Sequence, residues 1–222
     1  MIKAIIFDLD QTLIDRDATM INFLSEQHNR ILNNVVNKDS FVNSVIKFQE
    51  SGYADKFIAY QKTCINMKID CSLALDLYKD MENSYGENPI LLEGAKEVLE
   101  YLSKDYKIGL ISNGPRRWQE NKIKYSNIGS FFDSIIISGK KGIKKPNIEI
   151  FHKSCNDLNV RPKESVYIGD HPTNDIEAAI DAGMYGVWVK NENYCKPYKY
   201  NYIIDSLKDL IDKPWLNHIY QL

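Results

Sequence analysis

The segment KAIIFDLDQTL at residues 3–13 is the most informative part of this chain. Its first half, residues 3–7, is a short and nearly continuous apolar run. Such a run is typical of a strand in a parallel sheet whose two faces are both covered by helices. Asp8, Asp10 and Thr12 follow it directly. We therefore expect a central strand with polar residues at its carboxyl end.

Later apolar runs share the character of residues 3–7. Between them the apolar residues recur at helical spacing, so strands and helices alternate from about residue 92 onward. This alternation predicts right-handed crossovers and an α/β fold built on a doubly wound, Rossmann-like parallel sheet. The further predicted strands are residues 107–111, 134–137, 165–168, 185–189 and, more weakly, 202–204.

Residues 16–91 do not follow the alternating pattern. Apolar residues have helical spacing within residues 21–24, 57–65 and 73–81, and no convincing strand is visible. Breaks are expected near Asn33-Asn34, Ser51-Gly52 and residues 86–89. We predict an inserted all-helical domain over residues 16–91 and a discontinuous core made of residues 1–15 and 92–222.

Composition excludes several classes of protein. A hydrophobic content of 44% in 222 residues supports a substantial core and argues against disorder or a fibrous repeat. The net charge of −2, with no block of like charge, argues against a nucleic-acid binder. No apolar run approaches the roughly 18–20 residues that cross a bilayer, so we expect no membrane partner and a cytoplasmic protein. A monomer and a homodimer both remain open. The cysteines lack the paired spacing of a zinc site and are expected to be free thiols: Cys64, Cys71, Cys155 and Cys195.

Asp8 and Asp10 are two residues apart after a strand. Strand alternation, if it continues, points both carboxylates the same way. Two such groups repel each other unless a divalent cation lies between them, one carries a proton, or both face solvent. The alternative is that Asp8, Asp10 and Thr12 are turn and cap residues.

The second predicted strand of the core runs into Ser112-Asn113-Gly114-Pro115. A small polar side chain before a helix that Pro115 could begin is suited to binding phosphate through backbone N–H groups. The same four residues also form ordinary loops, so this segment alone does not establish an anion site.

Two further polar segments follow later strands. Residues 140–145 hold four lysines, of which Lys145 precedes Pro146, so its conformation is restricted; the alternative is a solvated basic loop. Asp170 and Asp175 follow the strand at 165–168, and a helix cap explains only one polar residue there.

Parallel strands place these segments together. Open α/β sheets bind ligands beyond the carboxyl ends of their strands, where Asp8, Asp10, Ser112, Lys145 and Asp170 are all expected. Three carboxylates suit Mg²⁺, and a serine and a lysine suit phosphoryl oxygens. Together with a carboxylate nucleophile, they predict a site for phosphoryl transfer.

The four segments, in this order, resemble the motifs of the haloacid dehalogenase superfamily, in its phosphatase branch. The resemblance covers the whole core, and the helical insertion is similar to a type 1 cap. Gln11 departs from the glycine commonest at its position.

The resemblance implies a role for each residue. Asp8 would be the nucleophile that forms an aspartyl phosphate, and Asp10 the general acid and then base. Mg²⁺ would be held by the Asp8 carboxylate, the Asp10 backbone carbonyl and Asp170, and Asp175 would orient Lys145 or a metal-bound water. Ser112 and Lys145 would act in catalysis, and the phosphate contacts would come from Thr12, Ser112, Asn113, Gly114 and Lys145.

Alternatives remain within and outside this superfamily. Haloalkanoate dehalogenases lack an acid two residues after the first aspartate, so Asp10 favours a phosphatase. A phosphomutase of the sugar-phosphate type would use the same residues. A signalling receiver is disfavoured by chain length and motif order, and a non-catalytic phosphate-binding protein by the presence of every acid.

The resemblance implies a small phosphorylated metabolite as the substrate. Nucleotides, sugar phosphates, phosphoglycolate and flavin mononucleotide all remain admissible. Side chains that could contact substrate, but more often belong to a solvated helix turn or a helical core, are Arg116, Arg117, Trp118, Tyr53, Phe57 and Tyr60.

Overall fold

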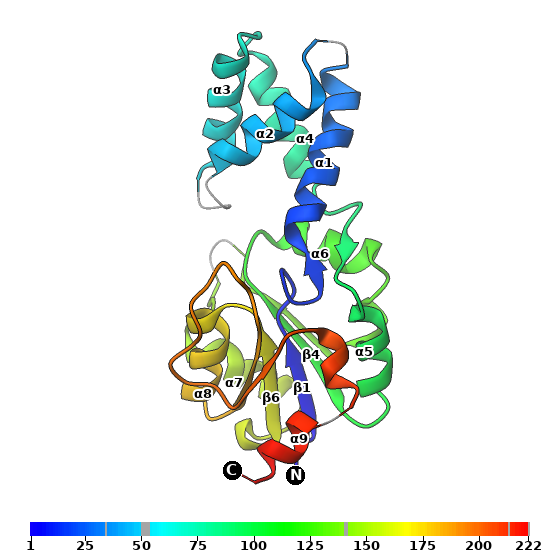
Figure 1. Ribbon diagram of the computed structural model, residues 1–222, viewed down its shortest axis with the longest axis vertical. Helices are drawn as coiled ribbons and strands as arrows, with labels where there is room; N and C mark the ends of the chain where they lie inside the picture. The colour runs from blue at the N-terminus through cyan, green and yellow to red at the C-terminus, as the bar shows by residue number, and fades with distance from the viewer. Residues whose placement is uncertain (34, 50–53, 140–141, 213, 222) are drawn as a thin grey trace. The chain divides into compact units, whose positions relative to one another are not determined.

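The computed structural model describes residues 1–33, 35–49, 54–139, 142–212 and 214–221. The chain forms two compact units (Figure 1). The core unit comprises Met1–Arg16 and Pro89–Leu222, and the inserted unit comprises Asp17–Asn88. The insertion predicted from the sequence spans residues 16–91.

A six-stranded sheet forms the centre of the core unit. Its strand order is β5-β4-β1-β6-β7-β8, and every neighbouring pair is parallel. The strand segments predicted from the apolar runs are all present, which confirms the α/β class with a doubly wound parallel sheet. The strands are β1 (Ala4–Phe7), β4 (Lys107–Ser112), β5 (Ser134–Ile137), β6 (Ser165–Gly169), β7 (Tyr185–Val189) and β8 (Tyr202–Ile204).

Helices cover both faces of this sheet (Figure 1). Because side chains alternate along a strand, Ile5 and Phe7 of β1 pack with α5 (Ala95–Leu102), and Ile6 packs with α7 (Ile148–Asp157) on the opposite face. All three side chains are fully buried. The other core helices include α6 (Arg116–Tyr125), α8 (Ala178–Asp181), which follows a π-helical turn η4 (Pro172–Glu177), and α9 (Pro214–Ile219).

Strand β1 is the topological switch point of the sheet. β4 and β5 lie on one side of it and β6, β7 and β8 on the other. Phe7 is in register with Leu110 of β4 and with Ile168 of β6. The loops that leave these three strands therefore begin next to one another, at the place where doubly wound sheets bind ligands.

A short antiparallel ribbon joins the two passages of the chain between the units. β2 (Ile14–Asp15) pairs with β3 (Ile90–Leu91). The expectation of no strand in residues 16–91 was therefore wrong for β3. Two-residue strands are too short to show a period in the sequence.

The inserted unit is helical in its described residues. A buried polar network joins three of its helices: Tyr60 Oη donates to Gln27 Oε1 at 2.6 Å, and Gln27 Nε2 donates to Leu77 O at 2.9 Å. Of the predicted breaks, Asn33 follows the first helix, while Asn34, Ser51 and Gly52 lie outside the described residues. The helices are α1 (Arg16–Ile31), α2 (Lys38–Gln49), α3 (Lys56–Met67) and α4 (Leu73–Ser84).

Two expectations about the whole chain concern membranes and thiols. In the described part of the chain, no helix combines the length and hydropathy that a membrane span requires. Cys64, Cys71, Cys155 and Cys195 are all free, as expected.

Candidate active site

The polar residues that follow the central strands lie at one edge of the sheet. Asp8 follows β1, Ser112 ends β4, and Asp170 follows β6. The backbone links two of these ends, since Asp8 N donates to Ile168 O at 2.9 Å. Lys145, between β5 and α7, reaches the same place with its side chain. The structure thus brings together residues from all four sequence segments.

Lys145 lies at the centre of this group. Its Nζ donates to Asp8 Oδ1 at 2.5 Å, to Asp175 Oδ1 at 2.6 Å and to Tyr167 Oη at 2.9 Å. An ammonium group has three donors, so these bonds use all of them. Burial lowers the pKa of Lys145, but Asp175 and Asp8 raise it more, and the net pKa lies well above its usual value. Lys145 is therefore a permanent buried cation beside Asp8.

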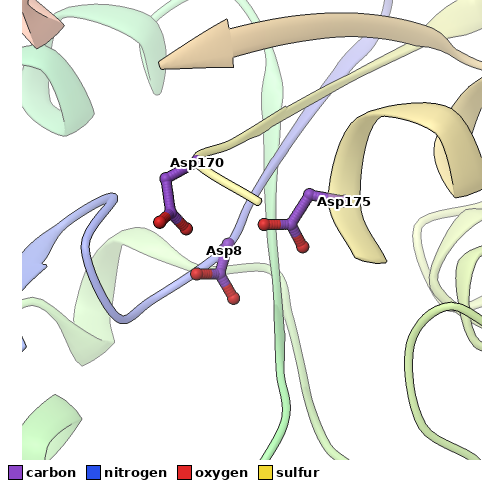
Figure 2. Close-up of side chains that lie close together, drawn as sticks. All are labelled: Asp8, Asp170 and Asp175. Carbon is purple, nitrogen blue, oxygen red and sulfur yellow. The ribbon is translucent and has the colours of Figure 1, made fainter. Parts of the chain in front are cut away.

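Three carboxylates lie close together around Asp8 (Figure 2). One oxygen from each of Asp8, Asp170 and Asp175 lies within 4.8 Å of the others, and all three residues are buried. Burial and the neighbouring carboxylates raise the pKa of Asp8 well above its usual value. Burial, followed by Asp175, raises the pKa of Asp170 to about 7. Such a cluster is electrostatically unfavourable unless a cation compensates it.

This cluster can hold a divalent metal ion. Carboxylate oxygens are the ligands that hard cations prefer, and one oxygen from each of three buried carboxylates lies within 4.8 Å of the others. The metal ligands that the resemblance implies are the Asp8 carboxylate, the Asp10 backbone carbonyl and Asp170. The structure places the Asp175 side chain beside Asp8 and Asp170, and the Asp10 carboxylate contacts Lys122.

Asp170 is oriented by two residues of the segment that begins at β7. Asn191 Nδ2 donates to Asp170 Oδ2 at 2.7 Å, and Trp188 Nε1 donates to Asp170 O at 2.6 Å. Asp175 is held in a similar way, because its Oδ2 accepts from His171 N at 3.0 Å while its Oδ1 contacts Lys145. Both carboxylates are therefore kept in one orientation before any ligand binds.

Asp10 lies outside the three-carboxylate cluster. β1 ends at Phe7, so the alternation of a strand does not extend to Asp10. Lys122 Nζ contacts Asp10 Oδ1 at 2.6 Å, and Gln119 Nε2 donates to Asp10 Oδ2 at 2.9 Å. Burial raises the pKa of Asp10, but the opposing effect of Lys122 and Gln119 is larger, so the net pKa lies below its usual value. In this arrangement Asp10 is a carboxylate.

The loop after β4 is bonded to the loop that carries Lys145. Asn113 Nδ2 donates to Lys145 O at 2.9 Å, and Lys145 N donates to Asn113 Oδ1 at 3.0 Å. The Asn113 amide is thus engaged with the backbone at both of its ends. Ser112 Oγ accepts from Gln119 Nε2 at 3.0 Å, and Gly114 N donates to Ser138 Oγ at 3.4 Å. The predicted phosphate loop is held in one conformation by these bonds.

Thr12 and Gln11 lie in the turn after Asp10. Thr12 is fully buried, and its Oγ1 has no hydrogen-bond partner among the described residues. Gln11 has a φ of 60°, a conformation that favours glycine. That backbone requirement explains why glycine suits this position, and Gln11 Oε1 here accepts from Arg16 N at 3.3 Å.

The segment before Pro146 is only partly described. Lys140 and Lys141 lie outside the described residues, and Lys144 is exposed. Pro146 does not begin the helix that follows; α7 begins at Ile148 and is capped by the side chain of Asn147.

The other candidates for substrate contact lie on α6 or within the inserted unit. Arg116 and Arg117 are exposed on α6, and Trp118 is half-buried. Phe57 packs edge-on against Tyr78 at 5.7 Å, and buried Tyr60 belongs to the Gln27 network. Tyr53 lies outside the described residues.

Comparison with known proteins identifies the family. The family model for haloacid dehalogenase-like hydrolases matches residues 5–189. The chain belongs to this family. The resemblance seen in the four motifs is therefore confirmed for the superfamily. Relatives of this chain that are named phosphatases support its place in the phosphatase branch of the superfamily.

Two such relatives match over most of their length. The human N-acylneuraminate-9-phosphatase is 28% identical over 94% of this chain and 92% of its own. The glyceraldehyde 3-phosphate phosphatase of Pyrococcus furiosus is 29% identical over 95% of this chain and 92% of its own. The solved structure of the haloacid dehalogenase-like hydrolase YfnB from Bacillus subtilis, bound to magnesium, shares the fold with a TM-score of 0.72 and 19% identity, covering 95% of this chain and 97% of that one.

Sequence reasoning missed the residues that contact the acids from other elements. Gln119 and Lys122 are three residues apart on α6, where the buried face also holds Ile123. Their signal was a polar pair on the helix face that turns inward. Tyr167, Trp188 and Asn191 gave no such signal, because their contacts depend on how the strands are ordered in the sheet. Tyr167 of β6 contacts Lys145, while Trp188 of β7 and Asn191, just after β7, contact Asp170.

Proposed function

We propose that the protein is a Mg²⁺-dependent phosphatase that hydrolyses a small phosphomonoester through an aspartyl phosphate on Asp8. The observation that carries this proposal is the pairing of Asp8 with the buried ammonium of Lys145, inside a cluster of three carboxylates. A cation beside a carboxylate nucleophile reduces its repulsion from a dianionic phosphate. The relatives that are named phosphatases support the same reaction class.

In the first step, an oxygen of Asp8 attacks phosphorus and the bond from phosphorus to the ester oxygen breaks. Asp10, a carboxylate in this structure, first takes up a proton from solvent and gives it to that ester oxygen, so an alcohol leaves and Asp10 is again a carboxylate. In the second step Asp10 takes a proton from water, whose oxygen attacks phosphorus. The bond to Asp8 then breaks and inorganic phosphate is released.

Asp8, Asp170 and the Asp10 backbone carbonyl would hold Mg²⁺, with Asp175 beside them. When bound, the ion supplies positive charge that favours approach of the phosphate to the nucleophile. The buried oxygens of the three-carboxylate cluster suit this ion. Asp175 also positions Lys145 through their 2.6 Å contact.

Ser112, Gly114, Thr12 and Lys145 would contact the phosphate. Since the Asn113 amide is engaged with the Lys145 backbone, the contribution of Asn113 to phosphate binding would come from its backbone. The inserted unit would serve as the cap that selects the leaving group. The cytoplasmic location and the choice between monomer and homodimer stay predictions.

The substrate would be a small phosphorylated metabolite. The names of the two phosphatase relatives specify an N-acylneuraminate and a glyceraldehyde 3-phosphate, which differ in size and share a phosphate on a small oxygenated carbon skeleton. Presence of Asp10 with its own polar partners favours a phosphatase over a dehalogenase, because a halide leaves without a proton.

The test is hydrolysis of p-nitrophenyl phosphate by the purified protein, with Mg²⁺ and with excess chelator. Asp8→Asn, prepared identically, is the matched variant. We expect turnover that needs both the metal and Asp8. Full activity in chelator or in Asp8→Asn would contradict the proposed mechanism, and no turnover by folded wild-type protein on this ester or on a panel of phosphomonoesters would favour a mutase or a binding protein.

A further inference from the structure

Two buried polar side chains of α6 contact the Asp10 carboxylate, one on each oxygen. Lys122 Nζ lies 2.6 Å from Oδ1, and Gln119 Nε2 lies 2.9 Å from Oδ2. The Lys122 side chain is only 3% exposed. Both oxygens of Asp10 thus have a donor from one rigid helix, which restricts the carboxylate to a single orientation.

Gln119 extends this contact to the phosphate loop. Its Nε2 also lies 2.7 Å from Asn113 O and 3.0 Å from Ser112 Oγ, so the two hydrogens of this amide are shared among three acceptors. Asp10 and the loop after β4 are therefore aligned by the same amide. Gly114 leaves room for it, because a Cβ at this position would lie 3.2 Å from Gln119 Nε2, and its φ of 121° also favours glycine.

Packing alone does not account for a lysine at position 122. Removing an ammonium group from water is unfavourable, and hydrophobic residues of similar volume often replace both partners of a buried ion pair without loss of stability. Such a replacement removes both partners, whereas methionine at position 122 alone would leave the Asp10 carboxylate without its cation. The lysine is therefore tied to the carboxylate that it contacts.

We propose that Lys122 and Gln119 are positioning residues for Asp10, which hold its carboxylate where it exchanges a proton with the leaving oxygen. This role rests on the proposed phosphatase reaction. As the phosphorus–ester bond breaks and the bond to Asp8 forms, the Asp10 proton moves to the ester oxygen. The carboxylate that remains is the species that both α6 donors bind in this structure.

The test compares two esters of nearly the same shape, phenyl phosphate and p-nitrophenyl phosphate. Phenolate is the more basic leaving group and depends more on a proton from Asp10. For Lys122→Met, we expect kcat/KM to fall about tenfold more on phenyl phosphate than on p-nitrophenyl phosphate, since correct placement of an acid contributes much of its rate effect. Lys122→Arg should restore part of the difference.

Three controls separate positioning from folding. Lys124→Met removes an exposed lysine of the same helix and should change neither ester. Thermal unfolding followed by circular dichroism identifies variants that remain folded. In an Asp10→Asn background, Lys122→Met should add no further difference between the two esters, because both changes act through one group.

Equal proportional losses on the two esters in folded Lys122→Met would overturn the positioning role. If Lys122→Met does not fold, Gln119→Leu, which removes the donor to the other Asp10 oxygen and keeps the ion pair, takes its place under the same criterion. A further ester-dependent loss in the Asp10→Asn background would also overturn it. Wild-type protein that hydrolyses neither ester nor any member of a phosphomonoester panel would overturn the phosphatase proposal and this inference together, an outcome distinct from the other two.

Discussion

Two buried lysines contact different acidic side chains of the candidate site. Lys145 contacts Asp8 and Asp175, and Lys122 contacts Asp10. The two acids of the first motif therefore have different surroundings, with the pKa of Asp8 raised and that of Asp10 lowered. Asp10 is present in the form that accepts a proton from water, and Asp8 lies where a bound cation would favour its ionised form.

Replacing Asp10 by asparagine tests its role as a single residue. Asp10→Asn keeps the size of the side chain and removes its acid. We expect kcat/KM on an alkyl phosphate to fall by about 10²–10⁴, the range usual for general acid–base catalysis, and far less on p-nitrophenyl phosphate. Steady-state kinetics on both esters would measure this, and equal losses would remove the assignment.

The carboxyl end of β6 places Asp170 and Asp175 beside Asp8. Gly169 is its last residue, and a Cβ there would lie 2.7 Å from Asp175 Cγ. The Asp175 side chain is 2% exposed and bonded to Lys145, so it has no room to move aside. The close approach of β6 to η4 thus requires glycine at this position.

Gly169→Ala should therefore displace Asp175 from Lys145. We expect a loss of about 1–3 kcal/mol in the free energy of unfolding, as for other overpacked sites, together with a large loss of kcat. Urea unfolding and hydrolysis of p-nitrophenyl phosphate would measure the two effects. Gly129→Ala is the matched control, because its Cβ would meet a single methyl carbon of Ile123 at 3.3 Å. An unaffected Gly169→Ala would show that Asp175 can shift freely.

Glu164 links the amino ends of β1 and β6, which lie away from the candidate site. Its carboxylate contacts Arg161 at 2.8 Å and Lys3 at 2.9 Å. Hydrogen bonds from Arg161 and Lys3 lower the pKa of Glu164 below its usual value of 4.5. A lowered pKa means that the stabilising effect is present above the unfolded value and is lost as the pH falls through the folded one.

Glu164→Gln should consequently lower the urea midpoint at about pH 7, and the difference from wild type should shrink toward about pH 3. Urea titrations at the two pH values would test this. Glu100→Gln, at an exposed position, should show no such dependence. A difference that grows as the pH falls would contradict the sign of the pKa shift.

At the scale of the molecule, the inserted unit is attached through one short ribbon. Ile14–Asp15 and Ile90–Leu91 pair antiparallel, so the two passages of the chain lie side by side where residues 17–88 begin and end. The hydrophobic clusters of the sheet are built from the core unit alone. Domain insertions are tolerated where the host domain has a hydrophobic core of its own, as here.

Replacing Asp17–Asn88 by a short glycine-containing turn should therefore give a chain that unfolds cooperatively. We expect it to retain Asp8-dependent hydrolysis of p-nitrophenyl phosphate and to lose discrimination among phosphomonoesters, if the inserted unit is the cap. Circular dichroism melts and a substrate panel would measure both. A shortened chain without a cooperative transition would show that the core needs the insertion to fold.

The amino-acid sequence alone was sufficient for the α/β class, the position of each core strand and the four polar segments after the strands. These features are local: they depend on the spacing of apolar residues along the chain and on which residue follows a strand. The two-residue strands β2 and β3 lay below the length at which such spacing is readable.

Only the tertiary structure decided which side chains contact the acids. Lys122 is 112 residues from Asp10 in sequence, and Asn191 is 21 from Asp170. Each contact depends on strand order and on which face of a helix turns toward the sheet. Residue type does not encode these, because a lysine or asparagine at an exposed position has the same local sequence signal as one that is buried beside a carboxylate.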